Sequence, residues 1–384
     1  MSKKNLLVIT NSFPDKDDMH PGGIFVKDQV RHIAPHFEKV TVVFPSAFGG
    51  SFVPREDFTD YRFDNVDVRF LRYVNVPLFL RVFRGGFTYF MARAIRKMLR
   101  AEHIDYDINH AYFTWPSGGA AARLKRESGV PLVVTEHTSL TLKSAVEKRD
   151  PQFVDTWMAC DAIIRNRQGD AEMFTSVGVP GDKIHYVPNG FDNWQFRPLD
   201  QHRSRELLGL PQDKRILVCI GGLEEVKGHR HLIDAVAEIT NARGDILCCI
   251  VGEGPLREQL LKLVAAKGVG DAVRLVGERS HAEIPHWINA SDAVVHPSLS
   301  ESGPMVMFEA LGCGRPFIGT KVGAVPGVIT SDDYGLVSEP GDAPSLKTNI
   351  EAALSREWDR KKIADHSKQY ASDWVSRELL DLYD

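Results

Sequence analysis

The sequence lacks the features that mark disulfide-rich, metal-binding and membrane-spanning proteins. Its five cysteines form no CxxC pair and no metal-ligand spacing, which favours small buried side chains in a reducing compartment. No apolar run approaches the length of about 18 residues needed to cross a bilayer. The apolar stretch 5–9 is too short for the core of a secretory signal. We therefore expect a cytoplasmic protein.

The sequence also has no excess of basic residues. The 47 lysines and arginines are outnumbered by 51 aspartates and glutamates, so the net charge is −4. Proteins that bind nucleic acid need a basic surface, and we expect no nucleic-acid partner. No GxGxxG follows the first apolar run, which argues against a dinucleotide oxidoreductase.

Short apolar runs alternate with longer amphipathic stretches through the whole chain. Continuous Val, Ile and Leu runs predict strands buried on both faces, at 6–9, 40–44, 66–70, 132–135, 162–164, 216–220, 246–251, 273–275, 293–295 and 316–318. Helical spacing between these runs predicts an α/β chain with doubly wound parallel sheets. Proline, glycine and polar residues gather between 189 and 211. This cluster separates an N-terminal domain, 1–195, from a C-terminal domain, 196–362.

Ligands of open α/β sheets bind at the carboxyl ends of the strands, so the loops there form the candidate site. Gly23 follows the run 6–9 and precedes a helix, where backbone amides and the helix dipole suit an anion. Gly222 and Lys227 follow the run 216–220 and suit a diphosphate, because the lysine neutralises a leaving group. The alternatives are turn-forming glycines and a solvated lysine.

One long loop near the C-terminus is the most informative. Pro304 suits the first position of a helix, which leaves the amides of Met305 and Val306 free to meet an anion. Glu301 precedes this helix and Glu309 lies in its second turn. Carboxylates accept hydrogen bonds from sugar hydroxyls, so the pair suits a polyhydroxylated ligand. The alternative is a capping carboxylate with a solvated helical one.

His137 directly follows the strand predicted at 132–135, at its carboxyl end, and is placed to contact a substrate. For a single histidine of this kind, a structural role is more common than a functional one. The segment 110–119 nearby has the composition of a loop rich in glycine and aromatic residues.

In this order the motifs resemble glycosyltransferase family 4, whose members are retaining enzymes of the GT-B fold. The similar segments span most of the chain: GIFV at 23–26, TEH at 135–137, VPNGFD and FRP within 187–198, KG at 227–228, VGEGP at 251–255, and Glu301-x7-Glu309 followed by ALGCGRP. The resemblance implies two Rossmann-like domains, with the C-terminal segment 363–384 completing the N-terminal domain.

The resemblance also implies a role for each matched residue. Gly23 contacts the donor diphosphate, and Lys227 stabilises it as it departs. Glu301 binds hydroxyls of the donor sugar, Glu309 binds the ribose, and His137 lies near the donor sugar or the reaction centre. The implied reaction moves a hexosyl unit from a UDP- or GDP-linked sugar to a hydroxyl of a glycan or lipid-linked acceptor. It retains the anomeric configuration and needs no metal or other cofactor.

Two departures and two alternatives qualify this resemblance. Gly222 stands where many members have arginine, so one phosphate contact is absent or is supplied elsewhere, and Lys227 carries more of the neutralisation. Pro304 removes an amide that members with glycine there present. A nucleotide-sugar epimerase of the same fold, or a non-catalytic partner subunit of a glycosyltransferase, remains an alternative. Donor sugar, base, acceptor and oligomeric state stay open.

Residues 78–100 hold six basic and no acidic side chains among many large apolar ones. Such a segment predicts peripheral association with an anionic surface at the inner face of the cell membrane. The alternative is an internal helix with a basic, solvated face.

Overall fold

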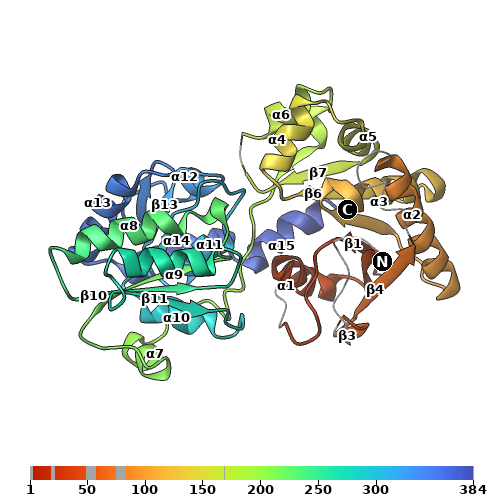
Figure 1. The fold of residues 1–384 in the computed structure, drawn as a ribbon. Coiled ribbons are helices and arrows are strands. Elements are labelled where there is room, and N and C mark those ends of the chain that lie inside the picture. Colours follow the sequence, from red (N-terminus) through yellow and green to blue (C-terminus); the bar gives the residue numbers. More distant parts are fainter. Residues whose placement is uncertain (1–2, 19–21, 49–57, 75–83, 168, 384) are drawn as a thin grey trace. The chain divides into compact units, whose positions relative to one another are not determined.

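The computed structural model describes residues 3–18, 22–48, 58–74, 84–167 and 169–383 (Figure 1). The chain divides into two compact units, each with its own sheet and core. The first unit comprises 1–188 together with 375–384, and the second comprises 189–374.

The sheet of the first unit has the strand order β3-β4-β2-β1-β5-β6-β7-β8. Every pairing in it is parallel except the antiparallel pair β3 and β4. The strands are β1 (Asn5–Thr10), β2 (Lys39–Phe48), β3 (Tyr61–Phe63), β4 (Val66–Val74), β5 (Ile108–Tyr112), β6 (Leu132–Glu136), β7 (Ala162–Arg165) and β8 (Ile184–Tyr186).

Helices cover both faces of this sheet, because successive apolar residues of a strand point to opposite sides. In β1, Leu7 and Ile9 belong to one buried cluster, whereas Leu6 and Val8 belong to another. The helices are α1 (Ile24–Ile33), α2 (Arg84–Ala101), α3 (Gly119–Ser128), α4 (Leu140–Glu147), α5 (Pro151–Ala159), α6 (Ala171–Thr175) and α15 (Ser372–Asp381), with short turns η1 (Ala34–His36), η3 (Thr114–Gly118) and η4 (Gly181–Lys183).

The second unit has a fully parallel sheet of order β11-β10-β9-β12-β13-β14. Its strands are β9 (Arg215–Ile220), β10 (Ile246–Val251), β11 (Val273–Gly277), β12 (Ala293–His296), β13 (Phe317–Thr320) and β14 (Gly335–Ser338). Its helices are α7 (Gln201–Leu207), α8 (His229–Thr240), α9 (Arg257–Ala266), α10 (Ile284–Ala290), α11 (Met305–Gly312), α12 (Val325–Val328), α13 (Ala343–Leu354) and α14 (Arg360–Ser367), with short turns η5 (Glu225–Lys227) and η6 (Lys368–Tyr370).

Every strand predicted from an apolar run overlaps an observed strand, and the α/β class is confirmed. The sequence prediction missed β3, β5, β8 and β14. The omission of β5 matters most, because this buried strand pairs with both β1 and β6. Asn109 and His110 lie within it, and their polarity caused part of the strand to be interpreted as a loop.

The boundaries of the units differ from the predicted ones. Phe191 and Phe196 are buried in the core of the second unit, so the chain already belongs to that unit at Asn189. Ile363 and Tyr370 lie in the same core. Only residues from Val375 onward, rather than the whole of 363–384, therefore complete the first unit.

Within the first unit, the end of the chain packs on one face of the sheet. Val375, Leu379 and Tyr383 share a buried cluster with Val26 and Val30 of α1. Figure 1 shows α15, in blue, beside α1, in red. The first unit is therefore built from two segments that are distant in sequence.

The predicted amphipathic segment 78–100 lies partly outside the described residues, since 78–83 are not among them. From Arg84 onward it forms α2, whose apolar side chains, including Phe87, Met91 and Ile95, are buried in the core. Its described part therefore presents a mainly basic face, on which Tyr89 is the large apolar side chain that is exposed. No helix in the described ranges is long and apolar enough to cross a membrane.

Candidate functional site

The loop after β9 carries Lys227 toward the loop after β12. Gly228 has a φ of 65°, and a Cβ atom there would lie 2.2 Å from the carbonyl oxygen of Pro297. Only glycine permits this close approach. The amide of Leu299 donates to the carbonyl of Val226 at 2.8 Å. The two loops are thus joined through their backbones on either side of Lys227.

This approach brings three donors onto one carboxylate oxygen. Glu301 Oε1 lies 2.7 Å from Lys227 Nζ, 2.9 Å from His296 Nε2 and 2.8 Å from Ser298 Oγ. Ser298 is itself fixed, because its carbonyl accepts from the Thr320 hydroxyl at 2.5 Å. His296 ends β12, so the rigid end of a strand positions the carboxylate.

The charge of Glu301 is maintained in spite of its partial burial. Burial alone raises the pKa of the carboxyl, but His296 and Lys227 outweigh it and lower that pKa to about 2. The second oxygen, Oε2, has no donor within hydrogen-bond distance among the described residues. Glu301 therefore has one oxygen fixed by the protein and one available to a ligand.

A neighbouring loop holds the backbone of Glu301. Gly323, with a φ of 53°, lies so close that a Cβ atom there would be 2.2 Å from the carbonyl oxygen of Ser302. The amide of Ala324 donates to the same carbonyl at 2.7 Å, and Asn189 Nδ2 donates to the carbonyl of Gly303 at 2.9 Å. These contacts restrict the segment between Glu301 and the helix that follows.

Helix α11 begins at Met305, with Pro304 as its N-cap rather than its first residue as predicted. The amides of Met305 and Val306 have no acceptor within hydrogen-bond distance among the described residues, so they remain free at the start of the helix. Glu309 lies buried in the second turn, and its Oε1 is 3.4 Å from His281 Nε2.

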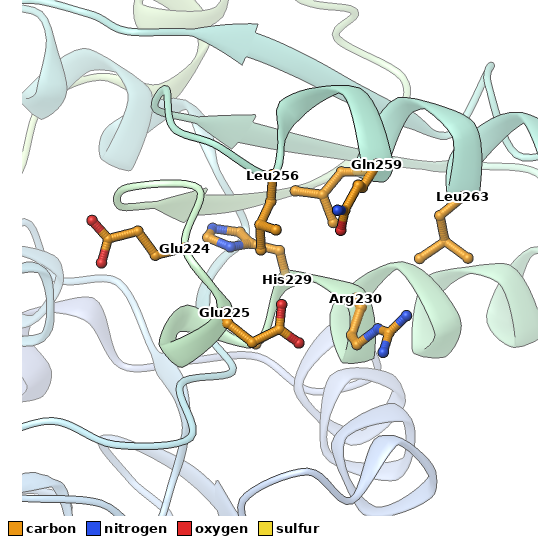
Figure 2. Close-up of a pocket in the computed structure, with 9 residues that line it drawn as sticks. Glu224, Glu225, His229, Arg230, Leu256, Gln259 and Leu263 are labelled. Carbon is orange, nitrogen blue, oxygen red and sulfur yellow. The ribbon is translucent and has the colours of Figure 1, made fainter.

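Gly222 lies in the same loop as Lys227 and has space beside it. The nearest atoms to a Cβ there would be the carbonyl oxygen of Glu253 at 3.8 Å and Glu224 Oε1 at 3.9 Å. Figure 2 shows a small pocket lined by part of this loop and by residues of α8 and α9, with a volume of about 90 Å³. The His229 ring borders it, with its Nδ1 unpartnered, and burial lowers the pKa of this histidine to about 4.

In the first unit, Gly23 ends the loop after β1 and caps α1. Its φ is 81°, and a Cβ atom there would lie 2.3 Å from the carbonyl oxygen of Ser12. A side chain at this position would therefore displace the loop. Gly23 leads directly into the first turn of α1, whose amides are capped by no described side chain, as an anion site at a helix N-terminus requires.

His137 lies after β6 among aromatic rings. Its ring centre is 4.7 Å from that of Phe25, 5.6 Å from that of Phe113, and 5.8 Å from that of Tyr112, to which it is stacked. Burial, with smaller effects from Arg165 and His110, lowers its pKa to about 3, so the ring is neutral. Its Nε2 is buried and has no hydrogen-bond partner within the described ranges.

A second histidine, His110, supports this arrangement and was missed with β5. It stacks on Tyr112 at 4.4 Å, and its Nδ1 and Nε2 lie 2.6 Å from Tyr383 Oη and 2.7 Å from Thr135 Oγ1. Glu136 shapes the adjacent loops, since its carboxylate accepts from the amides of Thr114 at 3.0 Å and Thr138 at 2.6 Å.

The predicted residues thus fall into two sets, each at the carboxyl ends of one sheet. Lys227 and Glu301 are in contact, and Gly222, Met305, Val306 and Glu309 lie in loops or helix starts at the same edge. Gly23 and His137 belong to the first unit. Sequence reasoning assigned no role to His296, which directly follows the strand predicted at 293–295, or to Ser298, two residues further on. Within the described ranges no group of three or more His, Cys, Asp or Glu side chains is arranged to hold a metal ion.

Comparison with known proteins covers both units. Residues 22–194 match the family model described as Glycosyltransferase Family 4, and residues 200–370 match the one described as Glycosyl transferases group 1. A D-inositol 3-phosphate glycosyltransferase from Pseudarthrobacter chlorophenolicus is 31% identical over 284 residues, covering 70% of this chain and 67% of that protein. D-inositol 3-phosphate glycosyltransferase 1 from Catenulispora acidiphila is 31% identical, and the match spans 67% of this chain and 65% of that protein, slightly less than two thirds of its length.

Solved structures show the same fold at lower identity. Sucrose-phosphate synthase from Thermosynechococcus elongatus has a TM-score of 0.80 at 20% identity, covering 99% of this chain and 98% of that chain. HepE from Anabaena in complex with UDP has a TM-score of 0.75 at 20% identity, covering 99% of both chains. These likenesses confirm the predicted architecture of two Rossmann-like domains.

Proposed function

Since the chain belongs to the glycosyltransferases of family 4 and group 1, we propose that it transfers a hexosyl unit from a nucleotide-diphosphate sugar to a hydroxyl acceptor. The observation that carries this proposal is the geometry at Glu301. Three donors hold one carboxylate oxygen, and the other is left to accept hydrogen bonds. A carboxylate held in this way suits the hydroxyls of a sugar.

The donor diphosphate is proposed to bind beside Lys227 and the start of α11. Lys227 is the cation nearest to Glu301, and the free amides of Met305 and Val306 supply the positive end of a helix dipole. Glu309 is assigned to the ribose and Glu301 to the donor sugar. In this scheme Lys227 offsets the charge that develops on the departing diphosphate.

The reaction is proposed to retain the anomeric configuration and to need no metal ion. Lys227 then supplies the positive charge, and the leaving phosphate takes the proton of the acceptor hydroxyl. Gly23 is assigned to the donor phosphates and His137 to the donor sugar or the reaction centre. The neutral ring of His137, with its unpartnered Nε2, supports a hydrogen-bonding role rather than a charged one.

The acceptor is proposed to be a polyhydroxylated molecule, free or lipid-linked. Two relatives are named for D-inositol 3-phosphate, so a phosphorylated cyclitol belongs among the first acceptors tested. The complex of HepE with UDP makes UDP-linked hexoses the first donors, with GDP-linked ones beside them.

A transfer assay tests this proposal. The purified protein is incubated with UDP- or GDP-linked hexoses and an acceptor panel, and the glycosylated product is identified by mass spectrometry. We expect product with one donor class, unchanged yield in EDTA, and an anomeric proton signal that shows retention. Epimerised sugar without transfer would support the epimerase alternative, and failure to bind any donor would support the non-catalytic one.

We further propose peripheral contact of α2 with the anionic inner face of the cell membrane, through charge alone. Arg93, Lys97 and Arg100 are exposed at helical spacing on this helix and have no ion-pair partner among the described residues. Each such cation near an anionic surface contributes about 1 kcal/mol. The double variant Arg93→Gln/Lys97→Gln should reduce sedimentation with phosphatidylglycerol vesicles at low salt, whereas Lys143→Gln/Lys148→Gln should not. Equal sedimentation of both variants would contradict the proposal.

A further inference from the structure

The opposite edge of the second sheet holds a pocket that the proposed transfer does not use. Its volume is about 520 Å³. It lies at the amino ends of the strands, since Arg215 begins β9, Asp292 immediately precedes β12 and Pro316 immediately precedes β13. Lys227 and Glu301 follow the carboxyl ends of β9 and β12. The pocket is therefore separated from the candidate donor site by the length of the strands.

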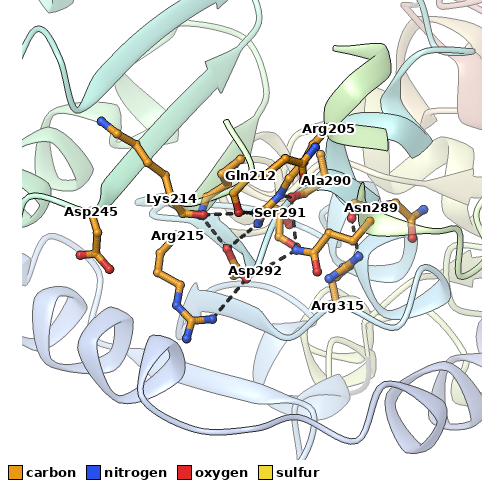
Figure 3. Close-up of polar contacts among 12 residues, drawn as sticks. Arg205, Gln212, Lys214, Arg215, Asp245, Asn289, Ala290, Ser291, Asp292 and Arg315 are labelled. Carbon is orange, nitrogen blue, oxygen red and sulfur yellow. Dashed lines mark hydrogen bonds and ion pairs between the residues drawn. The ribbon is translucent and has the colours of Figure 1, made fainter. Parts of the chain in front are cut away.

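Arginines dominate the charge around this pocket. Arg215, Arg356 and Arg360 line it, together with the carboxylates of Asp292 and Glu357. Arg205 adds a further cation, because its Nη2 lies 2.9 Å from Asp292 Oδ2. Figure 3 shows Arg205 and Arg215 reaching Asp292 from two directions.

Asp292 does not balance these charges. Its Oδ2 is already engaged by Arg205 and by the amide of Ile216 at 2.7 Å, and its Oδ1 lies 3.6 Å from Arg215 Nη1. Arg205 is fully used within the protein, since it also donates to the carbonyls of Ala290, Gln212 and Lys214. Among the described residues, the Arg360 side chain donates only to the neutral side chain of Gln201, at 2.8 Å.

A fifth arginine lies behind the wall of the pocket with unmet donors. Arg315 is 1% exposed, and Nη2 donates to the carbonyl of Asn289, but Nε and Nη1 have no partner in the described part of the chain. It directly precedes Pro316, and the backbone of Gly314 lies against Arg360, since a Cβ there would be 2.7 Å from the Arg360 carbonyl oxygen. A buried donor without an acceptor is destabilising, and more so when it is charged.

We propose that this pocket, hereafter the arginine pocket, binds a small phosphate-bearing molecule. Five guanidinium groups in or beside the pocket outnumber its two carboxylates, of which Asp292 is already engaged. The excess of positive charge is one that a phosphate dianion matches in charge and in hydrogen-bond geometry. The pocket volume accommodates a pyrophosphate or a sugar phosphate. Burial, together with the neighbouring Arg360, also lowers the pKa of Arg315 to about 9, which an anion in the pocket would reverse.

Titration calorimetry with inorganic pyrophosphate tests the proposal. The proposed donor site also attracts pyrophosphate, so the measurement uses Lys227→Ala protein. We expect binding to persist in this variant and to weaken by at least about tenfold when Arg215→Gln and Arg360→Gln are added. Both arginines lie at the surface of the pocket, so their replacement spares the core. Glucose 6-phosphate and uncharged glucose, as further probes, separate a preference for phosphate esters from one for free phosphate.

A matched control removes two positive charges elsewhere on the same unit. Arg203→Gln/Lys361→Gln in the Lys227→Ala background should change the affinity by less than about twofold, since both side chains are exposed outside the pocket. Loss of all binding in Lys227→Ala alone, or binding unaffected by Arg215→Gln/Arg360→Gln, would overturn the arginine pocket. Failure of the proposed transfer would appear differently, as nucleotide-sugar binding that is insensitive to Lys227→Ala.

Discussion

The carboxyl-end loops of the two units bury ionisable groups with opposite results. In the second unit Glu301 is partly buried and charged, and in the first unit His137 is partly buried and neutral. Burial disfavours the charged form of both groups. The difference comes from their partners, because Lys227 and His296 contact Glu301, whereas aromatic rings surround His137.

This contrast suits two different tasks. A fixed charge pair binds and neutralises a charged leaving group, and it does so best where backbone contacts keep it rigid. A neutral ring among aromatic side chains offers a hydrogen bond without attracting anions. We therefore expect the second unit to determine donor binding and the first unit to determine which acceptor receives the sugar.

The largest expected effect comes from removing the cation of the charged set. Lys227→Ala should reduce turnover by at least about tenfold, which corresponds to about 1.4 kcal/mol in the barrier, because nothing else in contact with Glu301 carries a permanent positive charge. The measurement is the steady-state rate at saturating donor. Lys262→Ala, an exposed lysine on α9, is the control and should retain full activity. Near-normal turnover in Lys227→Ala would contradict the proposal that the charged set around Glu301 neutralises the leaving diphosphate.

Glu301→Gln tests whether charge, rather than shape, matters at this edge. The amide is isosteric with the carboxylate but cannot accept on both oxygens, so we expect turnover to fall by about tenfold. His296→Asn should have the same sign and a smaller size, because Lys227 and Ser298 still hold Glu301 Oε1. A larger loss from His296→Asn than from Glu301→Gln would show that the histidine, not the carboxylate, meets the substrate.

The contrast could be predicted from the sequence only in part. Buried strands and the candidate residues after them were predictable, because apolar runs and glycines are local signals. The contact of Lys227 with Glu301 could not be predicted, since it joins residues 74 positions apart and depends on the close approach at Gly228. His110 was missed because its partner Tyr383 lies 273 positions away. When the partner is not known, a polar residue in the middle of an apolar run suggests a loop rather than a buried strand.

Acid stability should separate the two units by pH range, although the buried groups of both lose stabilisation as the pH falls. The ordinary pKa of histidine is 6.5, and burial lowers that of His110 to about 3. As the pH falls below 6.5, the unfolded chain gains a proton that the folded chain does not, so stability is lost, by about 1.4 kcal/mol per pH unit for this group, until the pH reaches about 3. His137 acts in the same direction and the same window.

Glu301 changes the pH dependence of stability only in a more acidic range. Its pKa falls from 4.5 to about 2 on folding, so its contribution is complete above 4.5 and is lost as the pH falls through 2. Urea unfolding at pH 7, 6 and 5 should therefore show a decline that His110→Gln makes shallower. Glu301→Gln should leave the decline unchanged. His103→Asn, an exposed position with a φ of 53° that asparagine tolerates, is the control. An unchanged slope in His110→Gln would contradict the assigned neutrality.

The smallest expected effect comes from adding charge to the second unit at Gly222. Its backbone is not in the left-handed region and its Cβ position is open to 3.8 Å, so Gly222→Arg should fold with a change in stability of about 0.5 kcal/mol or less. A guanidinium beside the proposed diphosphate should tighten donor binding by a few-fold, since Lys227 is then no longer the sole cation of this loop.

Gly254→Ala is the contrasting variant and should destabilise the unit, because a Cβ there would lie 2.7 Å from the backbone of Leu223. Donor affinity from titration calorimetry and thermal midpoints from calorimetry provide the two readouts. Weaker donor binding in a well-folded Gly222→Arg protein would mean that the sugar, not the diphosphate, lies beside this loop.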